Sequence, residues 1–210
     1  MLIINQNHIK MRSIKLLLIA LLLISSTTFA QKMDKSEIVL KNILERKSVR
    51  TYTEQRVEKE DLEKLLRAAM AAPTAVNAQP WAFIAIDDRE ILDNLADLLP
   101  YAKMLKQAQA AIIVCGNMEK ALEGEGQEYW IQDCSAATQN ILLAAESLGL
   151  GAVWTGVYPK KERIEVVQNE VSLPKHIIPL CVIPIGWQTG KEKPKQKYNE
   201  ENIHWNKWKE

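Results

Sequence analysis

The chain has 210 residues, of which 47% are hydrophobic, and this is enough for one domain with a substantial core. Its 27 basic and 26 acidic residues nearly cancel. Proteins that bind nucleic acid usually carry a strong positive excess, so the balance disfavours that class. No repeat, low-complexity tract or linker divides residues 31–210, which predicts a single domain.

Residues 1–30 have the features of a secretory signal peptide. They contain no Asp or Glu, and three basic residues precede an apolar run (residues 16–24) and a small-residue site that ends at Ala30. The run is about half of the ~20 residues that a membrane-spanning helix needs. We therefore expect cleavage after Ala30 and a periplasmic or secreted product without a stable membrane anchor, or a cytoplasmic protein if the signal is not used. The remaining 24 basic and 26 acidic residues give a net charge of −2.

Apolar periodicity and turn residues predict helices interspersed with a few strands. Helices are expected over about 35–46, 58–72, 88–98, just after Pro100, over 133–151 and from about Pro159, and strands over about 82–86, 110–116, 152–159 and 177–187. The strands are too few and too irregularly spaced for a doubly wound sheet, so the predicted fold class is α+β. Pro179 and Pro184 indicate that the last strand lies at a sheet edge or contains a bulge.

The longest predicted helix, 133–151, carries small residues that suit close helix contact. It is either a central or dimer-forming helix, or an ordinary core helix. Cys115, Cys134 and Cys181 are widely spaced, odd in number and without metal-ligand spacing, which predicts buried free thiols and no metal site.

Residues 188–208 have no helical or strand period, yet they carry four large apolar side chains, at Tyr198, Ile203, Trp205 and Trp208. A polar tail cannot bury such side chains by itself. An arm that lies across another surface, such as a second subunit, is therefore expected.

Two segments have the composition of a ligand site. Residues 45–53 (ERKSVRTYT) combine three cations with three hydroxyls, which suits phosphate oxygens, although cations at a helix C-terminus are also ordinary. Residues 73–81 (PTAVNAQPW) are mostly small, so they allow close approach of a flat ligand to the Asn77 amide. No Ser/His/Asp or Cys/His pattern, GxGxxG or P-loop is evident, which points to chemistry carried by a bound cofactor.

Four motifs together resemble those of the nitroreductase family of FMN-dependent oxidoreductases. They are residues 46–50 (RKSVR), 73–81 (PTAVNAQPW), 148–156 (LGLGAVWTG) and 195–197 (KQK). Each motif is weak alone, but their order and spacing make the resemblance specific over about residues 38–208. It implies a central mixed or antiparallel sheet flanked by helices, in a domain-swapped homodimer that exchanges C-terminal arms and binds two FMN at its interface.

The resemblance also implies a role for particular residues. The phosphate and ribityl chain of FMN would be held by Arg46, Lys47 and Ser48, and Lys195 and Lys197 would close on the phosphate. Lys197 stands where arginine is frequent and would supply a point charge instead of a fork.

The flavin ring would be contacted by the remaining motif residues. Arg50 would face its pyrimidine edge, and Thr155 and Gly156 would bring backbone groups to the N5 region. In the family the asparagine of the N-x-Q-P-W segment comes from the partner subunit, so Asn77 would act in trans. Thr74, where serine is more usual, and Gln79 complete the expected cofactor contacts. The full expected set is Arg46, Lys47, Ser48, Arg50, Thr74, Asn77, Gln79, Thr155, Gly156, Lys195 and Lys197.

The implied activity is electron transfer from NAD(P)H, or another donor, through FMN to nitro compounds, quinones or similar acceptors in a two-step ping-pong cycle. Tyr129 and Trp130 would line the acceptor pocket, or belong to the core. A non-catalytic flavin-binding or storage protein and a flavin-dependent dehalogenase of the same fold are the alternatives. Export conflicts with a nicotinamide donor, so an exported protein would acquire FMN after export and use another donor.

Overall fold

The computed structural model describes residues 34–208, and within them residues 39–208 form one compact unit. The predicted signal peptide lies outside the described residues. No helix between residues 34 and 208 is long and apolar enough to cross a bilayer. The elements are α2 (Lys35–Glu45), α3 (Lys59–Met70), η1 (Ala75–Asn77), β1 (Trp81–Ile86), α4 (Arg89–Leu98), η2 (Lys103–Lys106), β2 (Ala110–Asn117), η3 (Gly124–Gly126), α5 (Tyr129–Ser147), β3 (Leu150–Ala152), β4 (Thr155–Gly156), α6 (Lys161–Glu170), β5 (Ile177–Trp187) and η4 (Glu200–Asn202).

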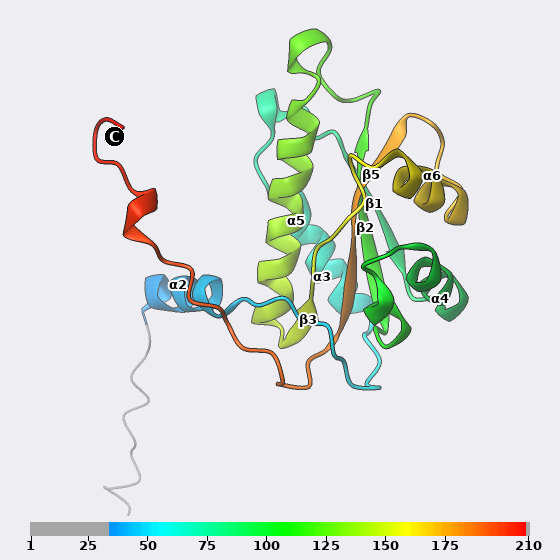
Figure 1. The fold of residues 1–210 in the computed structure, drawn as a ribbon, viewed down its shortest axis with the longest axis horizontal. Helices are drawn as coiled ribbons and strands as arrows, with labels where there is room; N and C mark the ends of the chain where they lie inside the picture. The colour runs from blue at the N-terminus through cyan, green and yellow to red at the C-terminus, as the bar shows by residue number, and fades with distance from the viewer. Residues whose placement is uncertain (1–33, 209–210) are drawn as a thin grey trace, which may run out of the picture. The chain divides into compact units, whose positions relative to one another are not determined.

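The strands form one five-stranded antiparallel sheet in the order β1-β2-β5-β3, with β4 also paired to β5. Helices α3 and α5 cover one face of this sheet, and α4 and α6 cover the other (Figure 1). The predicted α+β class is confirmed. The sheet is buried on both faces, because Ile112 and Val114 of β2 join the core under α5 while Ile113 and Cys115 join the core under α4.

Strand β5 is the centre of the sheet, so the expectation of an edge strand is wrong, whereas the alternative of a bulge is confirmed. The register with β2 shifts where Val114 faces Cys181 and Cys115 faces Pro179. On the other side β4 pairs with residues 181–182 and β3 with residues 185–187. Pro184 falls between these two pairings, where its missing N–H breaks no ladder bond to β3 or β4.

Helix α5 begins at Tyr129, four residues before the predicted start. The extra turn is stabilised because Trp130, only 4% exposed, packs in the same core as Ala137 and Ile141. Ala137 and Ala145 are fully buried within the subunit, as an ordinary core helix requires, and a dimer-forming role of α5 stays a prediction. The predicted strand over 152–159 is wrong in its extent, since the ladder on β5 is interrupted between β3 and β4.

The three cysteines are free and buried, as predicted. Burial raises the pKa of Cys115 and of Cys181 to about 12, so both thiols stay protonated at neutral pH. The Cys134 thiol donates a hydrogen bond to the Cys115 carbonyl oxygen at 3.3 Å. Within residues 34–208 no group of three His, Cys, Asp or Glu side chains could hold a metal ion.

The segment that follows α2 is attached to the end of the sheet. The Val49 N–H donates to the Ala152 carbonyl at 3.0 Å, and the Thr53 N–H donates to the Trp187 carbonyl at 2.9 Å. Val49 lies against Gly151 so closely that a Cβ added to this glycine would be 2.5 Å from Val49 Cγ1. Because Gly151 has no side chain, Val49 and the RKSVR segment can lie this close to β3.

We predict that Gly151→Ala lowers the free energy of unfolding by about 1–3 kcal/mol, because the added methyl group overpacks this contact. Gly156→Ala is the matched control, since a Cβ there meets no atom within 4 Å. Val49→Ala should recover part of the loss in the Gly151→Ala background, as measured by denaturant unfolding. Equal stability of the Gly151→Ala and Gly156→Ala variants would contradict the packing argument.

Candidate functional site

Two hollows share the side chain of Arg50. The first, which we call the Trp154 hollow, has a volume of about 510 Å³ and is lined by Arg50, Tyr101, Lys103, Met104, Val153, Trp154, Thr155 and Gly156. The second, the lysine hollow, has a volume of about 360 Å³ and is lined by Arg46, Lys47, Ser48, Arg50, Glu192, Lys193, Lys195 and Lys197. Of the eleven predicted contact residues, the structure gathers eight around these two hollows.

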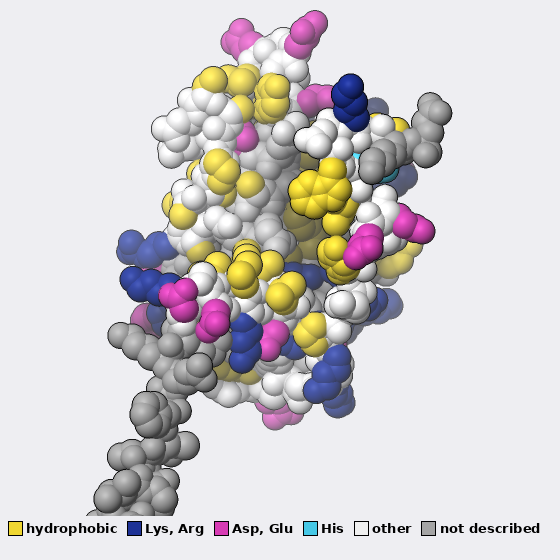
Figure 2. All heavy atoms as spheres, turned by 90° about the vertical axis from the view of Figure 1, so that its left-hand side faces the viewer, with side chains coloured by type: hydrophobic (Ala, Val, Ile, Leu, Met, Phe, Trp, Pro, Cys, Tyr) yellow, Lys and Arg dark blue, Asp and Glu magenta, His cyan; other side chains and the backbone are white. Residues whose placement is uncertain are grey.

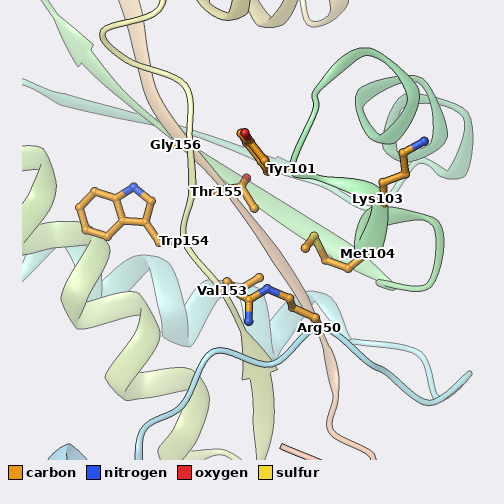
Figure 3. A pocket seen from close by; sticks show the side chains of 8 residues that line it. All are labelled: Arg50, Tyr101, Lys103, Met104, Val153, Trp154, Thr155 and Gly156. Carbon is orange, nitrogen blue, oxygen red and sulfur yellow. The ribbon is translucent and has the colours of Figure 1, made fainter. Parts of the chain in front are cut away.

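The Trp154 hollow presents backbone and apolar surface. Figure 3 shows the β3–β4 segment on one side, the η2 segment on the other, and the Trp154 ring and the Lys103 ammonium pointing away. The Thr155 hydroxyl donates to the Val182 carbonyl at 2.6 Å. This buried side chain is therefore held by β5, and Thr155 lines the hollow. Gly156 leaves open space where a Cβ would stand. A flat ligand can therefore approach the backbone of Thr155 and Gly156 closely.

The lysine hollow concentrates positive charge from two distant segments of the chain, residues 46–50 and 193–197. Its lining contains six Lys or Arg side chains and one carboxylate. Among residues 34–208, only one of the six cations has a carboxylate partner: Lys47 Nζ lies 2.7 Å from Glu146 Oε1, with both side chains 13% exposed. The other five are available to a bound anion, and a phosphate dianion suits such a cluster.

The predicted residues Thr74, Asn77 and Gln79 line neither hollow in the described chain. They belong to the loop before β1, where the Thr74 hydroxyl oxygen accepts the Gln79 N–H at 3.2 Å. The Gln79 amide nitrogen donates to Asn77 Oδ1 at 3.3 Å, and the Asn77 side chain is exposed. Action of Asn77 in trans stays a prediction.

Tyr129 and Trp130 also line neither hollow. Trp130 packs edge-to-face on Tyr158, with ring centroids 5.0 Å apart. Its ring also lies so close to Gly116 that a side chain on this glycine would clash with it. For Trp130 the core alternative is therefore confirmed, whereas Tyr129 is exposed and its place in an acceptor pocket stays a prediction.

Sequence reasoning missed Glu192, which joins the two segments of the lysine hollow. Its Oε1 accepts the Arg50 N–H at 2.9 Å, the Thr51 N–H at 3.0 Å and the Thr51 hydroxyl at 2.9 Å. Its Oε2 is enclosed and has no hydrogen-bond partner within the described residues. Partial burial opposes ionisation, but the bonds from Arg50 and Thr51 outweigh it and lower the pKa of the Glu192 carboxyl. In the sequence Glu192 stands between Lys191 and Lys193, and nothing there indicates its hydrogen bonds to Arg50 and Thr51.

Comparison with known proteins identifies the family. The sequence profile of the nitroreductase family matches residues 43–102 and 98–187. The chain belongs to the nitroreductase family. A relative in Methanothermobacter thermautotrophicus, provisionally named NADH dehydrogenase/NAD(P)H nitroreductase, is 45% identical over 84% of this chain and 89% of its own.

Solved structures of nitroreductase-family proteins have the same fold. One from Bacteroides thetaiotaomicron, also provisionally named NADH dehydrogenase/NAD(P)H nitroreductase, is 55% identical with a TM-score of 0.77 over 81% of this chain and 98% of its own. A provisionally named nitroreductase of Desulfovibrio desulfuricans, solved in complex with FMN, is 29% identical with a TM-score of 0.69 over 81% of this chain and 98% of its own.

We predict that Glu192→Ala destabilises this nitroreductase-family protein at pH 7 by about 1.5 kcal/mol, because it removes hydrogen bonds to an ionised acceptor. A lowered folded-state pKa stabilises the fold above the ordinary value of 4.5, and this contribution is lost as the pH falls through the lower folded value. The difference between wild type and Glu192→Ala in urea unfolding should therefore shrink below about pH 4. Glu192→Gln, which keeps an acceptor oxygen, should lose less at pH 7. A difference that does not decrease at any pH below 4.5 would contradict the stabilising role of the ionised Glu192 carboxylate.

Proposed function

We propose that this protein is an FMN-dependent NAD(P)H oxidoreductase whose FMN phosphate binds in the lysine hollow and whose flavin ring binds in the Trp154 hollow. The observation that carries the proposal is that Arg50 lines both hollows, so a single ligand with an anionic end and a flat end can occupy them together. The names of the relatives and the FMN complex of one of them support it.

The residues present fit FMN at both ends. At the phosphate end, Arg46, Lys195 and Lys197 have no carboxylate partner among residues 34–208, and Ser48 adds a hydroxyl. At the ring end, Gly156 leaves its side-chain position empty. A cation-rich hollow alone would suit any phosphate, whereas the combination with an apolar second hollow suits a flavin mononucleotide.

The residues of the chain bind and orient, and none needs to act as a nucleophile. Bound FMN would supply the redox chemistry, which is hydride acceptance from the donor and electron transfer to the acceptor. The Arg50 guanidinium would stabilise negative charge at the pyrimidine edge of the ring. The backbone of Thr155 and Gly156 would fix the opposite edge, because the Thr155 side chain is held by β5.

The same proposal includes a homodimer that exchanges its C-terminal arms. On α2 the side chains of Val39, Leu40, Ile43 and Leu44 are exposed, and in the tail those of Tyr198, Ile203, Trp205 and Trp208 are exposed. Figure 2 shows hydrophobic side chains grouped between charged ones over the face of the molecule that it presents. A second copy of the chain that covers these side chains would also bring the Asn77 loop to the FMN of its partner.

The acceptors proposed are nitro compounds, quinones or similar small molecules. The proposed organisation is a signal peptide in residues 1–30 and one FMN-binding domain in residues 31–210. NAD(P)H is the proposed donor for a cytoplasmic protein, and another donor would serve an exported one.

The test of function is anaerobic spectroscopy of the purified protein with stoichiometric FMN. Addition of NADH or NADPH should bleach the flavin absorption, and subsequent addition of a nitroaromatic or a quinone should restore it. Flavin that stays bound but is reduced by neither nicotinamide would favour the non-catalytic binding protein.

We predict that Arg46→Ala weakens FMN binding by about 1.5–3 kcal/mol, the value of a charged hydrogen bond, and leaves riboflavin binding nearly unchanged. Riboflavin lacks the phosphate, so fluorescence titration with both ligands separates the phosphate contact from general damage. Lys175→Ala, at an exposed lysine that lines neither hollow, is the control. Equal weakening of riboflavin and FMN would contradict the assignment of the lysine hollow to the phosphate.

A further inference from the structure

The loop that carries Asn77 is held in an unfavourable backbone conformation. Val76, Asn77 and Gln79 have φ values of +44°, +59° and +51°. Asparagine tolerates this left-handed region, but a β-branched valine does not. Val76 is 81% exposed, so packing within the subunit does not explain its conformation. Some other contact must hold the loop.

A buried carboxylate on α5 contacts this loop from outside it. Asp133, 6% exposed, accepts the Ala75 N–H on Oδ1 at 2.9 Å. Ala75 is the first residue of η1, and N–H groups at the start of a helical turn have no partner within the turn. The N-cap residue Thr74 makes no side-chain cap to this turn, because its hydroxyl oxygen accepts the Gln79 N–H instead.

Core packing of α5 fixes the position of the Asp133 backbone. Cys134 and Ala137, in the turn after Asp133, are fully buried in the main core. Burial of a carboxylate is more costly than burial of a neutral acceptor, so a side chain chosen for stability alone would more often be apolar or neutral here. The position of Asp133 under the loop thus points to a role in the conformation of the loop.

We propose that Asp133 is a positioning residue for Asn77: its carboxylate holds the loop of residues 73–81 in the conformation that presents the Asn77 amide outward. The effect on the loop is independent of any ligand. The consequence for FMN affinity rests on the proposed function and on the action of Asn77 in the cofactor site.

The first experiment measures amide hydrogen exchange of residues 75–79 in FMN-free protein. Asp133→Ala should accelerate exchange in this loop at least tenfold, and Asp133→Asn, which keeps an acceptor oxygen, should restore much of the protection. Asn140→Ala is the matched control, because Asn140 ties α5 to the Ala68 carbonyl at 2.9 Å and does not touch the loop. Loop exchange in Asp133→Ala that equals that of wild type would overturn the proposal.

The second experiment is a double-mutant cycle on FMN affinity with Asn77→Gly, chosen because glycine accepts the left-handed conformation at this position. Asp133→Ala should weaken FMN binding about tenfold in the wild-type background and less than twofold in the Asn77→Gly background. Weakening by the same factor in both backgrounds would show that Asp133 does not act through Asn77 and would overturn the proposal. If wild-type protein binds no FMN, the proposed function fails and the exchange measurement alone decides the role of Asp133.

Discussion

The candidate site depends on the pairing of β5 with β2 on one side and with β3 and β4 on the other. This one strand ends beside β3 and leads directly into the lysine-rich tail. The Thr53 N–H bonds the carbonyl of Trp187, and Tyr52 bridges to Gln188, so the segment after α2 is attached at the same place. Backbone hydrogen bonds thus join the segment after α2 to β3 and to the end of β5, although Val49 and Ala152 are 103 residues apart and Thr53 and Trp187 are 134 residues apart.

Local charge, not the overall charge of the protein, distinguishes the lysine hollow. The whole chain is nearly neutral, yet six cations line this hollow. Two carboxylates moderate the repulsion in different ways. Glu146 pairs with Lys47, whereas Glu192 binds backbone N–H groups and ties the tail to the Arg50 segment. Within residues 34–208, the hollow therefore keeps Arg46, Lys195 and Lys197 without a carboxylate partner while its two walls remain connected.

Much of the fold could be predicted from the sequence because its periodic signals are local. The helices before Pro73 and the strand over 177–187 were correct, since apolar spacing and helix breakers act over a few residues. The prediction of an edge position for β5 was wrong. A proline can occupy this central strand because Pro184 falls in the gap between the pairings of β5 with β3 and with β4. That gap is a property of three strands together.

The residues of the site were predictable where they belong to short motifs, and not where they act across the fold. Arg46, Ser48 and Lys195 followed from motifs. Glu192 and Asp133 contact residues that are 142 and 58 positions away, and nothing in their neighbours indicates it. The left-handed conformation of Val76 could not be predicted either, because valine disfavours it.

In the proposed dimer each site is composed from two subunits, with the phosphate held by one chain and Asn77 supplied by the other. Co-expression of Arg46→Ala chains with Asn77→Gly chains, followed by FMN titration of the purified mixed dimer, tests it most directly. If Asn77 acts in trans, one of the two sites in the mixed dimer has both native residues and should bind FMN with wild-type affinity at half the stoichiometry. If both residues serve the same chain, every site carries one substitution, and no wild-type affinity would be recovered.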